Sequence, residues 1–319
     1  MSSSKAFDFR RGDHGRGDDK SLLWRLRRPI VPAAKRAIRA YGTATASSRV
    51  LPSYLLIGAK RGGSTTLARS LAASPGVQGL FPAREQLKGP YYFDVNFDKG
   101  ESWYRSHFPT RSALGSDIVG ESSPYYISHP HAAERARQLV PDARIVCVLR
   151  HPVERAFSHY RERVKQGVET LHTFDAAIDA EPSRIDGEVA RMERDASYVS
   201  WEHLNFAYCD QSRYAASLER WFAHWPREQV LVLRSEDLYA DPAAVLDRTR
   251  DFLGLAGLKT GSETAVQNHN QLPPAKISAE TRQRVWNLVS ADVERLADLT
   301  GQAPLWSLDG PIESTASHA

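Results

Sequence analysis

One glycine-rich stretch of the sequence carries the residue types that bind phosphate groups. It reads Gly-Ala-Lys-Arg-Gly-Gly-Ser-Thr-Thr over residues 58–66, between an apolar run and a segment of helical composition. Gly62 and Gly63 let the backbone approach an anion, and N–H groups at the start of the following helix point toward it. This stretch is therefore predicted to cradle an anionic group.

The side chains of the same stretch support this interpretation. Lys60 and Arg61 add positive charge, and Ser64 and Thr65 add hydroxyl donors. Two adjacent cations inside a tight turn are unfavourable unless an anion neutralises them. The pattern resembles a Walker A loop, but Ser64 stands where that motif needs lysine. The turn thus favours a phosphate-bearing ligand and disfavours hydrolysis of a magnesium nucleotide.

A second stretch, from Arg150 to Tyr160, follows the apolar residues 143–149. Arg150 falls at the carboxyl end of a predicted strand, and Ser158 lies about two turns into the helix expected after it. Ligands of doubly wound sheets collect outside the carboxyl ends of the strands. An arginine with a serine can hold a phosphate. If the two strands are neighbours, Arg150 and Ser158 are placed to hold a second phosphate of one ligand.

The elements that must position these residues are strands alternating with helices. Apolar runs predict strands over residues 54–57, 143–149 and 229–234, and helical spacing predicts helices over 67–72, 153–164, 212–224, 242–253 and 279–299. This order is typical of an α/β fold in which helices flank a parallel, P-loop-like sheet. Residues 181–200 are charged and weakly periodic, and we expect a loop there. The length of 319 residues fits a single domain with a large core.

The basic charge is concentrated at the N-terminus. Residues 1–50 carry a net charge of +8, and the remainder carries −4. We expect a disordered basic arm over 1–50, a folded domain over 51–307 and a disordered tail over 308–319. The arm offers a contact with anionic membrane surfaces, and nothing in the folded part suggests a nucleic-acid partner.

Composition excludes several classes of protein. Hydrophobic residues make up 41% and charged residues 25% of the chain, a mix typical of globular proteins. No run of 18 apolar residues predicts a membrane span. The two cysteines, Cys147 and Cys209, show neither the spacing of a zinc site nor a disulfide framework. We therefore expect no bound metal. We also expect the protein to be cytoplasmic, with possible contact between the basic arm and the inner membrane surface.

These stretches, in their order along the chain, resemble the motifs of the sulfotransferases that use 3′-phosphoadenosine 5′-phosphosulfate (PAPS). The resemblance is to the bacterial and heparan-sulfate-type branch of that family. Residues 57–67 resemble the 5′-phosphosulfate loop of that family, and residues 149–160 resemble its 3′-phosphate element. Further similarity lies in residues 88–94, 100–109, 120–126 and 229–242. The similarity covers roughly residues 52–306.

The resemblance implies a donor site and a reaction. The 5′-phosphosulfate would be held by Arg61, Gly62, Gly63, Ser64, Thr65 and Thr66, with Lys60 adding charge. The 3′-phosphate would be held by Arg150 and Ser158. PAPS is then the sulfuryl donor, and 3′-phosphoadenosine 5′-phosphate is the product. The resemblance implies that no metal is required. It also implies that the acceptor is a small molecule or glycan, most simply a carbohydrate or glycolipid that is sulfated on a hydroxyl.

Three positions depart from the family pattern. The family commonly has lysine where Arg61 stands, so either Lys60 or Arg61 would stabilise the leaving group. It often has lysine where Ser122 stands, and it usually has a glutamate, the general base, where Gly89 stands. The base therefore has to come from elsewhere in this chain.

A base assists the reaction because the acceptor hydroxyl loses a proton as the new bond forms. The candidates are Glu85, Asp94, Glu121, His107 and His151. Asp94 ranks first because it matches an acid in the substrate cleft of the family, and Glu121 ranks second.

Two other functions remain open at this point. A P-loop small-molecule kinase would need magnesium and ATP, which the missing Walker lysine disfavours. A non-catalytic binder of nucleotides or sulfated glycans would have lost the base, and Gly89 is the residue that keeps this alternative open.

Overall fold

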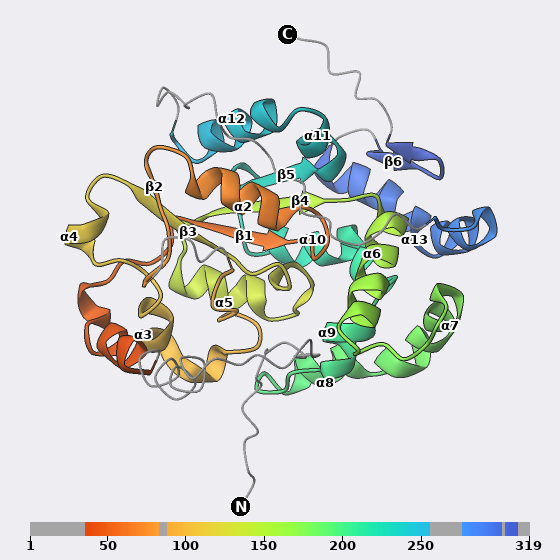
Figure 1. The fold of residues 1–319 in the computed structure, drawn as a ribbon, viewed down its shortest axis with the longest axis horizontal. Coiled ribbons are helices and arrows are strands. Elements are labelled where there is room, and N and C mark those ends of the chain that lie inside the picture. The colour runs from red at the N-terminus through yellow and green to blue at the C-terminus, as the bar shows by residue number, and fades with distance from the viewer. Residues whose placement is uncertain (1–35, 83–87, 256–275, 302–303, 312–319) are drawn as a thin grey trace, which may run out of the picture.

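A five-stranded parallel sheet forms the centre of the protein (Figure 1). The computed structural model describes residues 36–82, 88–255, 276–301 and 304–311. The strand order is β2-β3-β1-β4-β5. The strands are β1 (Tyr54–Gly58), β2 (Val77–Gln78), β3 (Ile118–Ser122), β4 (Arg144–Leu149) and β5 (Val230–Arg234). The parallel α/β fold predicted from the sequence is confirmed.

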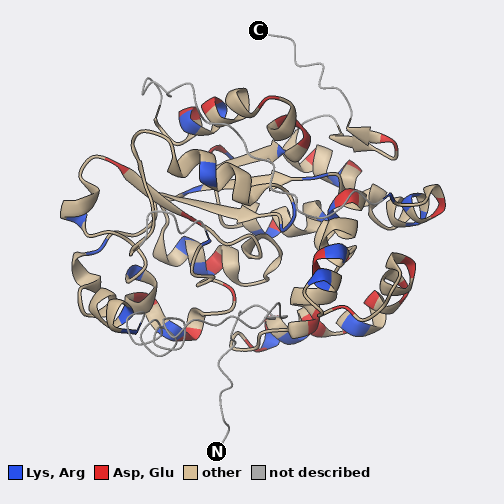
Figure 2. Ribbon diagram, viewed as in Figure 1, with Lys and Arg blue, Asp and Glu red and all other residues tan. Residues whose placement is uncertain are grey.

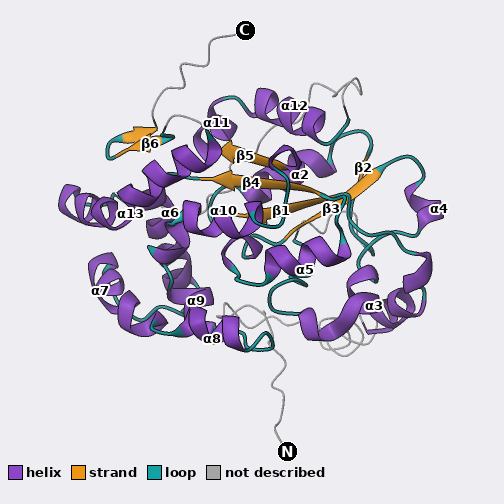
Figure 3. Ribbon diagram, turned by 180° about the vertical axis from the view of Figure 1, so that it is seen from behind, coloured by secondary structure: helices purple, strands orange, loops and turns teal. Residues whose placement is uncertain are grey.

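Helices cover both faces of the sheet (Figures 1 and 3). One face packs against α2 (Ser64–Ala72), α11 (Ser235–Ala240) and α12 (Pro242–Phe252). The other packs against α5 (Ala132–Leu139), α10 (Tyr214–Phe222) and α13 (Ala279–Thr300). The remaining helices are α3 (Gly100–Arg105), α4 (Arg111–Leu114), α6 (Pro152–Lys165), α7 (Phe174–Ile185), α8 (Glu188–Arg194) and α9 (Trp201–Phe206).

The core follows from the alternation of side chains along the central strands. Leu55 and Ile57 of β1 face the α5 and α10 side, whereas Tyr54 and Leu56 face α2. All five residues of β1 are buried, as expected for a strand covered by helices on both faces. Apolar residues at every position of such a strand are what made it recognisable in the sequence.

The pairing of β1 with β4 places the two predicted phosphate-binding stretches side by side. Leu56 of β1 pairs with Val146 of β4, so both strands end at the same edge of the sheet. The glycine-rich turn follows β1 and leads into α2, and Arg150 follows β4 and leads into α6. Pro152 occupies the first turn of α6, where its missing N–H is no loss.

The loop expected over residues 181–200 is wrong for most of this range, because α7 continues to Ile185 and α8 extends to Arg194; residues 195–200 do form a loop. Tertiary contacts override the weak periodicity there. The buried carboxylate of Glu181 accepts hydrogen bonds from the N–H groups of Cys209 and Asp210, and Met192 is buried. Both cysteines are buried and free.

The boundaries of the folded domain also differ from the prediction. Residues 36–44 are helical, and Arg49 is 1% exposed, with its guanidinium donating to the carbonyl of Phe108 at 2.5 Å. The N-terminal part of the predicted arm, 1–35, lies outside the described residues. At the other end, β6 (Trp306–Ser307) pairs with β7 (Gly310–Pro311), so the predicted tail begins too early. Residues 312–319 lie outside the described part.

Candidate functional site

The turn after β1 presents the start of α2 to a ligand. Gly63 caps the helix with φ 102°, and no side chain caps it. The N–H groups of the first turn of a helix carry partial positive charge and bind anions. The turn is fixed to β4, because the Ala59 N–H donates to the Val148 carbonyl at 2.8 Å. Ser64 is buried and Thr65 is exposed, so the predicted hydroxyl groups lie at different depths.

Gly62 is required by its contact with β4. A Cβ at this position would lie 2.2 Å from the backbone oxygen of Val148. We expect Gly62→Ala to displace the turn, lowering the free energy of unfolding by roughly 1–3 kcal/mol and weakening donor binding. Thermal unfolding and donor titration measure the two effects.

Gly115→Ala is the matched control for Gly62→Ala. Gly115 has φ 61° and open space around it, so this change adds backbone strain without a steric clash. Unaltered donor affinity in Gly62→Ala would contradict the role given to the turn.

Arg61 connects the turn to α6. Its Nε donates to Oγ of Ser158 at 3.0 Å, and its Nη1 lies 3.6 Å from Oε2 of Glu162. Two residues that the sequence assigns to opposite ends of the donor therefore touch. Figure 2 shows basic residues both in the turn after β1 and along α6.

Arg150 lies beside this pair. Burial lowers the pKa of Arg61; the charge of Glu162 opposes this shift, and the charge of Arg150 adds to it. The guanidinium groups of Arg61 and Arg150 are therefore within electrostatic range of each other. Nη2 of Arg150 lies 3.7 Å from Glu154, and the Arg150 carbonyl accepts a hydrogen bond from Tyr214. The structure thus brings together the turn, Arg150 and Ser158 as the sequence predicts.

Lys60 points in another direction. Its Nζ donates to the carbonyl of Leu204 in α9 at 2.8 Å and lies 4.2 Å from the centre of the Tyr125 ring. Burial lowers the pKa of Lys60 well below its usual value; the charge of Arg163 acts in the same direction, and Asp94 opposes it. Of the two adjacent cations, Arg61 contacts Ser158 of the predicted 3′-phosphate element, and Lys60 contacts α9 within electrostatic range of Asp94.

Asp94 is a buried carboxylate with one oxygen that has no hydrogen-bond partner among the described residues. Oδ1 accepts from the N–H of Val95 at 2.6 Å, and Oδ2 is the atom without a partner. Burial raises the pKa of Asp94 to about 7; the charge of Glu121 adds to the shift, and Lys60 opposes it. A carboxylate with a pKa near neutrality and a vacant oxygen has the properties of a general base.

Glu121 is buried as well, but both of its oxygens are occupied. Oε1 accepts from the hydroxyls of Tyr104 and Tyr126, and Oε2 accepts from Ser123 at 2.6 Å. A Cβ at Gly89 would lie 1.7 Å from Glu121 Oε2, so the glycine makes room for this carboxylate. A side chain at position 89 would therefore collide with Glu121.

The two carboxylates predict a pH dependence of stability. Burial raises the pKa of Glu121, like that of Asp94, to about 7. Both pKa values are higher in the folded state, so stability is greatest below the unfolded pKa and is lost as pH rises through 7. We expect the free energy of unfolding to fall by roughly 2–4 kcal/mol between about pH 5 and pH 8. Denaturation at both pH values tests this, and an equal fall in the double variant Asp94→Asn, Glu121→Gln would contradict it.

The other candidate bases do not join this cluster. Glu85 lies outside the described residues. The pKa of His107 is lowered to about 3 by burial, and its Nδ1 contacts the Trp103 carbonyl. Nε2 of His151 contacts the Ser307 carbonyl, and its ring stacks on Trp286.

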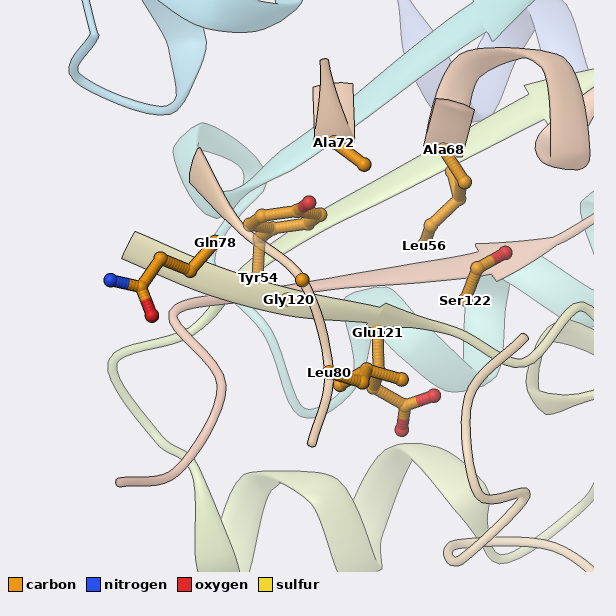
Figure 4. Close-up of a pocket in the computed structure, with 10 residues that line it drawn as sticks. Tyr54, Leu56, Ala68, Ala72, Gln78, Leu80, Gly120, Glu121 and Ser122 are labelled. Carbon is orange, nitrogen blue, oxygen red and sulfur yellow. The ribbon is translucent and has the colours of Figure 1, made fainter. Parts of the chain in front are cut away.

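Ser122 lies on the opposite side of β3 from Glu121. Figure 4 shows the Glu121 side chain pointing away from Ser122 and Leu56. Ser122 lines a cavity of about 20 Å³ together with Tyr54, Leu56, Ala68 and Ala72. This volume holds one water molecule, so the cavity is not the donor site.

Two residues of the site were not identified in the sequence. Arg163 of α6 donates to Oδ1 of Asn205 at 2.7 Å, and its charge lowers the pKa of Lys60. Tyr91 has φ 52° and its N–H donates to Ser123, which brings its phenol within electrostatic range of Asp94 and Arg163. The positive φ of a non-glycine residue is typical of functional sites, but it is not visible in a sequence.

Comparisons with known proteins identify relatives of this chain. Heparan sulfate glucosamine 3-O-sulfotransferase 3B1 of Homo sapiens is 30% identical over 234 residues, which cover 73% of this chain and 53% of the relative. Bifunctional heparan sulfate N-deacetylase/N-sulfotransferase 3 of Homo sapiens is 30% identical over 208 residues, or 64% of this chain and 22% of the relative. The chain therefore spans about a fifth to about half of the length of these curated relatives.

A solved structure shares the fold. The sulfotransferase from Alicyclobacillus acidocaldarius superposes with a TM-score of 0.60 at 26% identity, covering 79% of this chain and 97% of that one. The model of the family described as "Sulfotransferase domain" matches residues 51–291, which contain the turn after β1, Arg150 and Ser158. With this match over most of its length, the chain belongs to the sulfotransferase family.

Proposed function

We propose that the protein transfers a sulfuryl group from PAPS to a hydroxyl of a carbohydrate acceptor. The observation that carries this proposal is the 3.0 Å hydrogen bond between Arg61 and Ser158. It joins the anion-binding turn after β1 to the element that follows β4. A donor with phosphate groups at both ends of an adenosine needs two such anion sites close together.

The donor would lie across the carboxyl ends of β1 and β4. The turn N–H groups, with Gly62, Gly63, Ser64, Thr65 and Thr66, would bind the 5′-phosphosulfate. Arg150 and Ser158 would bind the 3′-phosphate. This second phosphate site is what would distinguish PAPS from an ordinary nucleotide, and the chemistry needs no metal.

The reaction is an in-line displacement at sulfur, comparable to phosphoryl transfer. The acceptor oxygen forms a bond to sulfur while the bond between sulfur and the 5′-phosphate oxygen breaks. The acceptor proton passes to Asp94, and the products are a sulfate ester and 3′-phosphoadenosine 5′-phosphate. Arg61 and the turn N–H groups would stabilise the charge that develops on the leaving phosphate.

The acceptor class rests on the relatives. Both curated relatives are heparan sulfate sulfotransferases by name. Lys60 lies 4.2 Å from the centre of the Tyr125 ring and within electrostatic range of Asp94, and an acceptor that uses Asp94 as its base would approach the sulfur here. The precise acceptor is set by the loops around this side.

Transfer of labelled sulfate from PAPS into glycan acceptors tests the proposal, with the product identified by mass spectrometry. Label in an acceptor hydroxyl supports it. Intact donor binding without transfer to any acceptor would instead support the non-catalytic binder, and turnover of magnesium ATP without PAPS turnover would support the kinase.

A membrane contact of the basic arm stays a prediction, as does the cytoplasmic setting. Among the described helices, none combines the length and the apolar character needed to cross a bilayer. Sedimentation of the full chain with anionic vesicles, compared with a chain lacking residues 1–35, tests the contact: equal sedimentation would contradict it.

A further inference from the structure

The C-terminal hairpin of β6 and β7 lies outside the residues that match the family model, which end at 291. Figures 1 and 3 show β6 beside α11 and α13. Trp306 of β6 is 1% exposed and belongs to the same hydrophobic cluster as Ile145 and Leu149 of β4. The hairpin is therefore part of the folded domain, and it packs close to the residues that follow β4.

The peptide group between Arg150 and His151 is held on both sides. Its carbonyl, that of Arg150, accepts a hydrogen bond from the Tyr214 hydroxyl at 2.8 Å. Its N–H, that of His151, donates to Oε1 of Glu236 at 2.9 Å. Because both polar atoms are bound, the peptide plane cannot rotate without breaking a hydrogen bond. The orientation of this plane sets the direction in which the Arg150 side chain leaves the backbone.

Trp306 contacts both of the side chains that hold this peptide. Its indole N–H donates to Oε2 of Glu236 at 3.1 Å, so the hairpin and His151 share one carboxylate. The centre of its ring lies 5.9 Å from the centre of the Tyr214 ring. The indole thus fixes the carboxylate that binds the peptide N–H and packs beside the phenol that binds the peptide carbonyl.

The imidazole of His151 is a second connection to the hairpin. Its Nε2 lies 2.8 Å from the Ser307 carbonyl, which can only accept, so Nε2 carries a proton and donates. Burial lowers the pKa of His151, and the hydrogen bond to Ser307 opposes this shift. His151 is therefore neutral at physiological pH, and it ties the hairpin to the residue next to Arg150.

The side chain of Arg150 is restrained less than its backbone. Nη2 lies 3.7 Å from Oε2 of Glu154, an acid that also pairs with Arg282 of α13, and the side chain is 26% exposed. A long side chain loses conformational freedom when it binds a phosphate, and a fixed starting point reduces this loss. The restraint on the peptide therefore affects how well Arg150 can hold a phosphate.

We propose that Trp306 is a positioning residue for the donor: through Glu236 and Tyr214 it fixes the peptide from which Arg150 extends, and so prepares the 3′-phosphate site. This inference rests on the proposed function, in which Arg150 binds that phosphate. Trp306 acts through its neighbours and not by touching the donor. A change at Trp306 should therefore reduce the affinity that the 3′-phosphate contributes and leave the affinity for the rest of the nucleotide.

The test compares adenosine 3′,5′-bisphosphate with adenosine 5′-monophosphate by calorimetric titration of the full chain. Trp306→Phe keeps an aromatic ring but loses the indole N–H. We expect its affinity for the bisphosphate to fall about tenfold, with affinity for the monophosphate nearly unchanged. Glu236→Gln should have the same effect, because an amide nitrogen cannot accept the hydrogen bond that a carboxylate oxygen accepts. It decides the matter if Trp306→Phe does not fold.

The double variant Trp306→Phe, Glu236→Gln separates positioning from general destabilisation. Both changes disrupt one shared contact, so together they should weaken bisphosphate binding by less than the product of their separate effects. Trp225→Phe is the matched control. Trp225 is 2% exposed and its indole N–H donates to the Ala133 carbonyl at 3.3 Å, so this change also removes an indole hydrogen bond from the core. It should keep the preference for the bisphosphate.

The outcomes distinguish this inference from the proposed function. If the unaltered chain prefers the bisphosphate and both Trp306→Phe and Glu236→Gln keep that preference, the positioning role is overturned and the donor assignment stands. An equal loss of the preference in Trp225→Phe would also overturn the positioning role. Equal affinities for the two nucleotides in the unaltered chain would refute the donor assignment, and the positioning role with it.

Discussion

Replacing Arg61 by alanine is expected to weaken binding of adenosine 3′,5′-bisphosphate by about 100-fold or more and to lower kcat/KM for PAPS at least as much. The guanidinium joins the turn after β1 to Ser158 and, in the proposed reaction, would stabilise the leaving phosphate. Its loss removes a charge-assisted contact at the point where charge develops. Calorimetry and steady-state kinetics with varied PAPS measure the two effects.

This substitution isolates the side chain. Arg61 has φ 68°, and alanine has the same backbone strain there as arginine, so stability should change little. Arg69→Ala, which removes an arginine from the last turn of α2, is the control and should bind donor normally. Wild-type donor affinity in Arg61→Ala would show that the turn is not the phosphosulfate site.

Replacing Asp94 by asparagine is expected to lower kcat by about 10²- to 10⁴-fold, the usual contribution of a general base. Donor affinity should stay the same, because the hydrogen bond of the Asp94 side chain is to the N–H of Val95 and not to a residue assigned to the donor. The asparagine side chain would fill the same space without accepting a proton. Single-turnover rates with saturating PAPS separate this effect from product release.

The pH profile gives an independent test of Asp94. Burial raises its pKa to about 7, so the ionised fraction and the rate should fall as pH drops below 7 and should level off above it. The residual activity of Asp94→Asn should lack this step. Glu121→Gln is the comparison, since Glu121 has a similarly raised pKa but no vacant oxygen. A larger loss of kcat in Glu121→Gln than in Asp94→Asn would transfer the base to Glu121.

The sequence was sufficient to predict the two strands that end at the proposed donor site. Residues of β1 and β4 are apolar at nearly every position, and glycine or proline marks the end of each strand, so both could be predicted. Strand β3 could not, because Gly120, Glu121 and Ser122 are not typical of a strand. Gly120 is explained by the Tyr54 ring, 2.3 Å from where its Cβ would lie, and Glu121 by its three hydroxyl donors.

The site was predicted in part for similar reasons. The contact between Arg61 and Ser158 follows from the adjacency of β1 and β4, which the motifs already suggested. The direction of the Lys60 side chain could not be predicted in this way. It depends on the positive φ of Arg61 and on the carbonyl of Leu204, which is 144 residues further along the chain. Arg163 was missed because it lies off the helical stripe of Ser158 and contacts Asn205, which is 42 residues further along the chain.

The central claim is that the turn after β1 and the residues after β4 hold two ends of one donor. Calorimetric titration of the full chain tests it most directly, by comparing adenosine 3′,5′-bisphosphate with adenosine 5′-monophosphate. The account predicts that the bisphosphate binds at least about tenfold more tightly and that Arg150→Ala abolishes this preference. Absence of binding heat for the bisphosphate, or equal affinities for the two nucleotides in the unaltered chain, would contradict it.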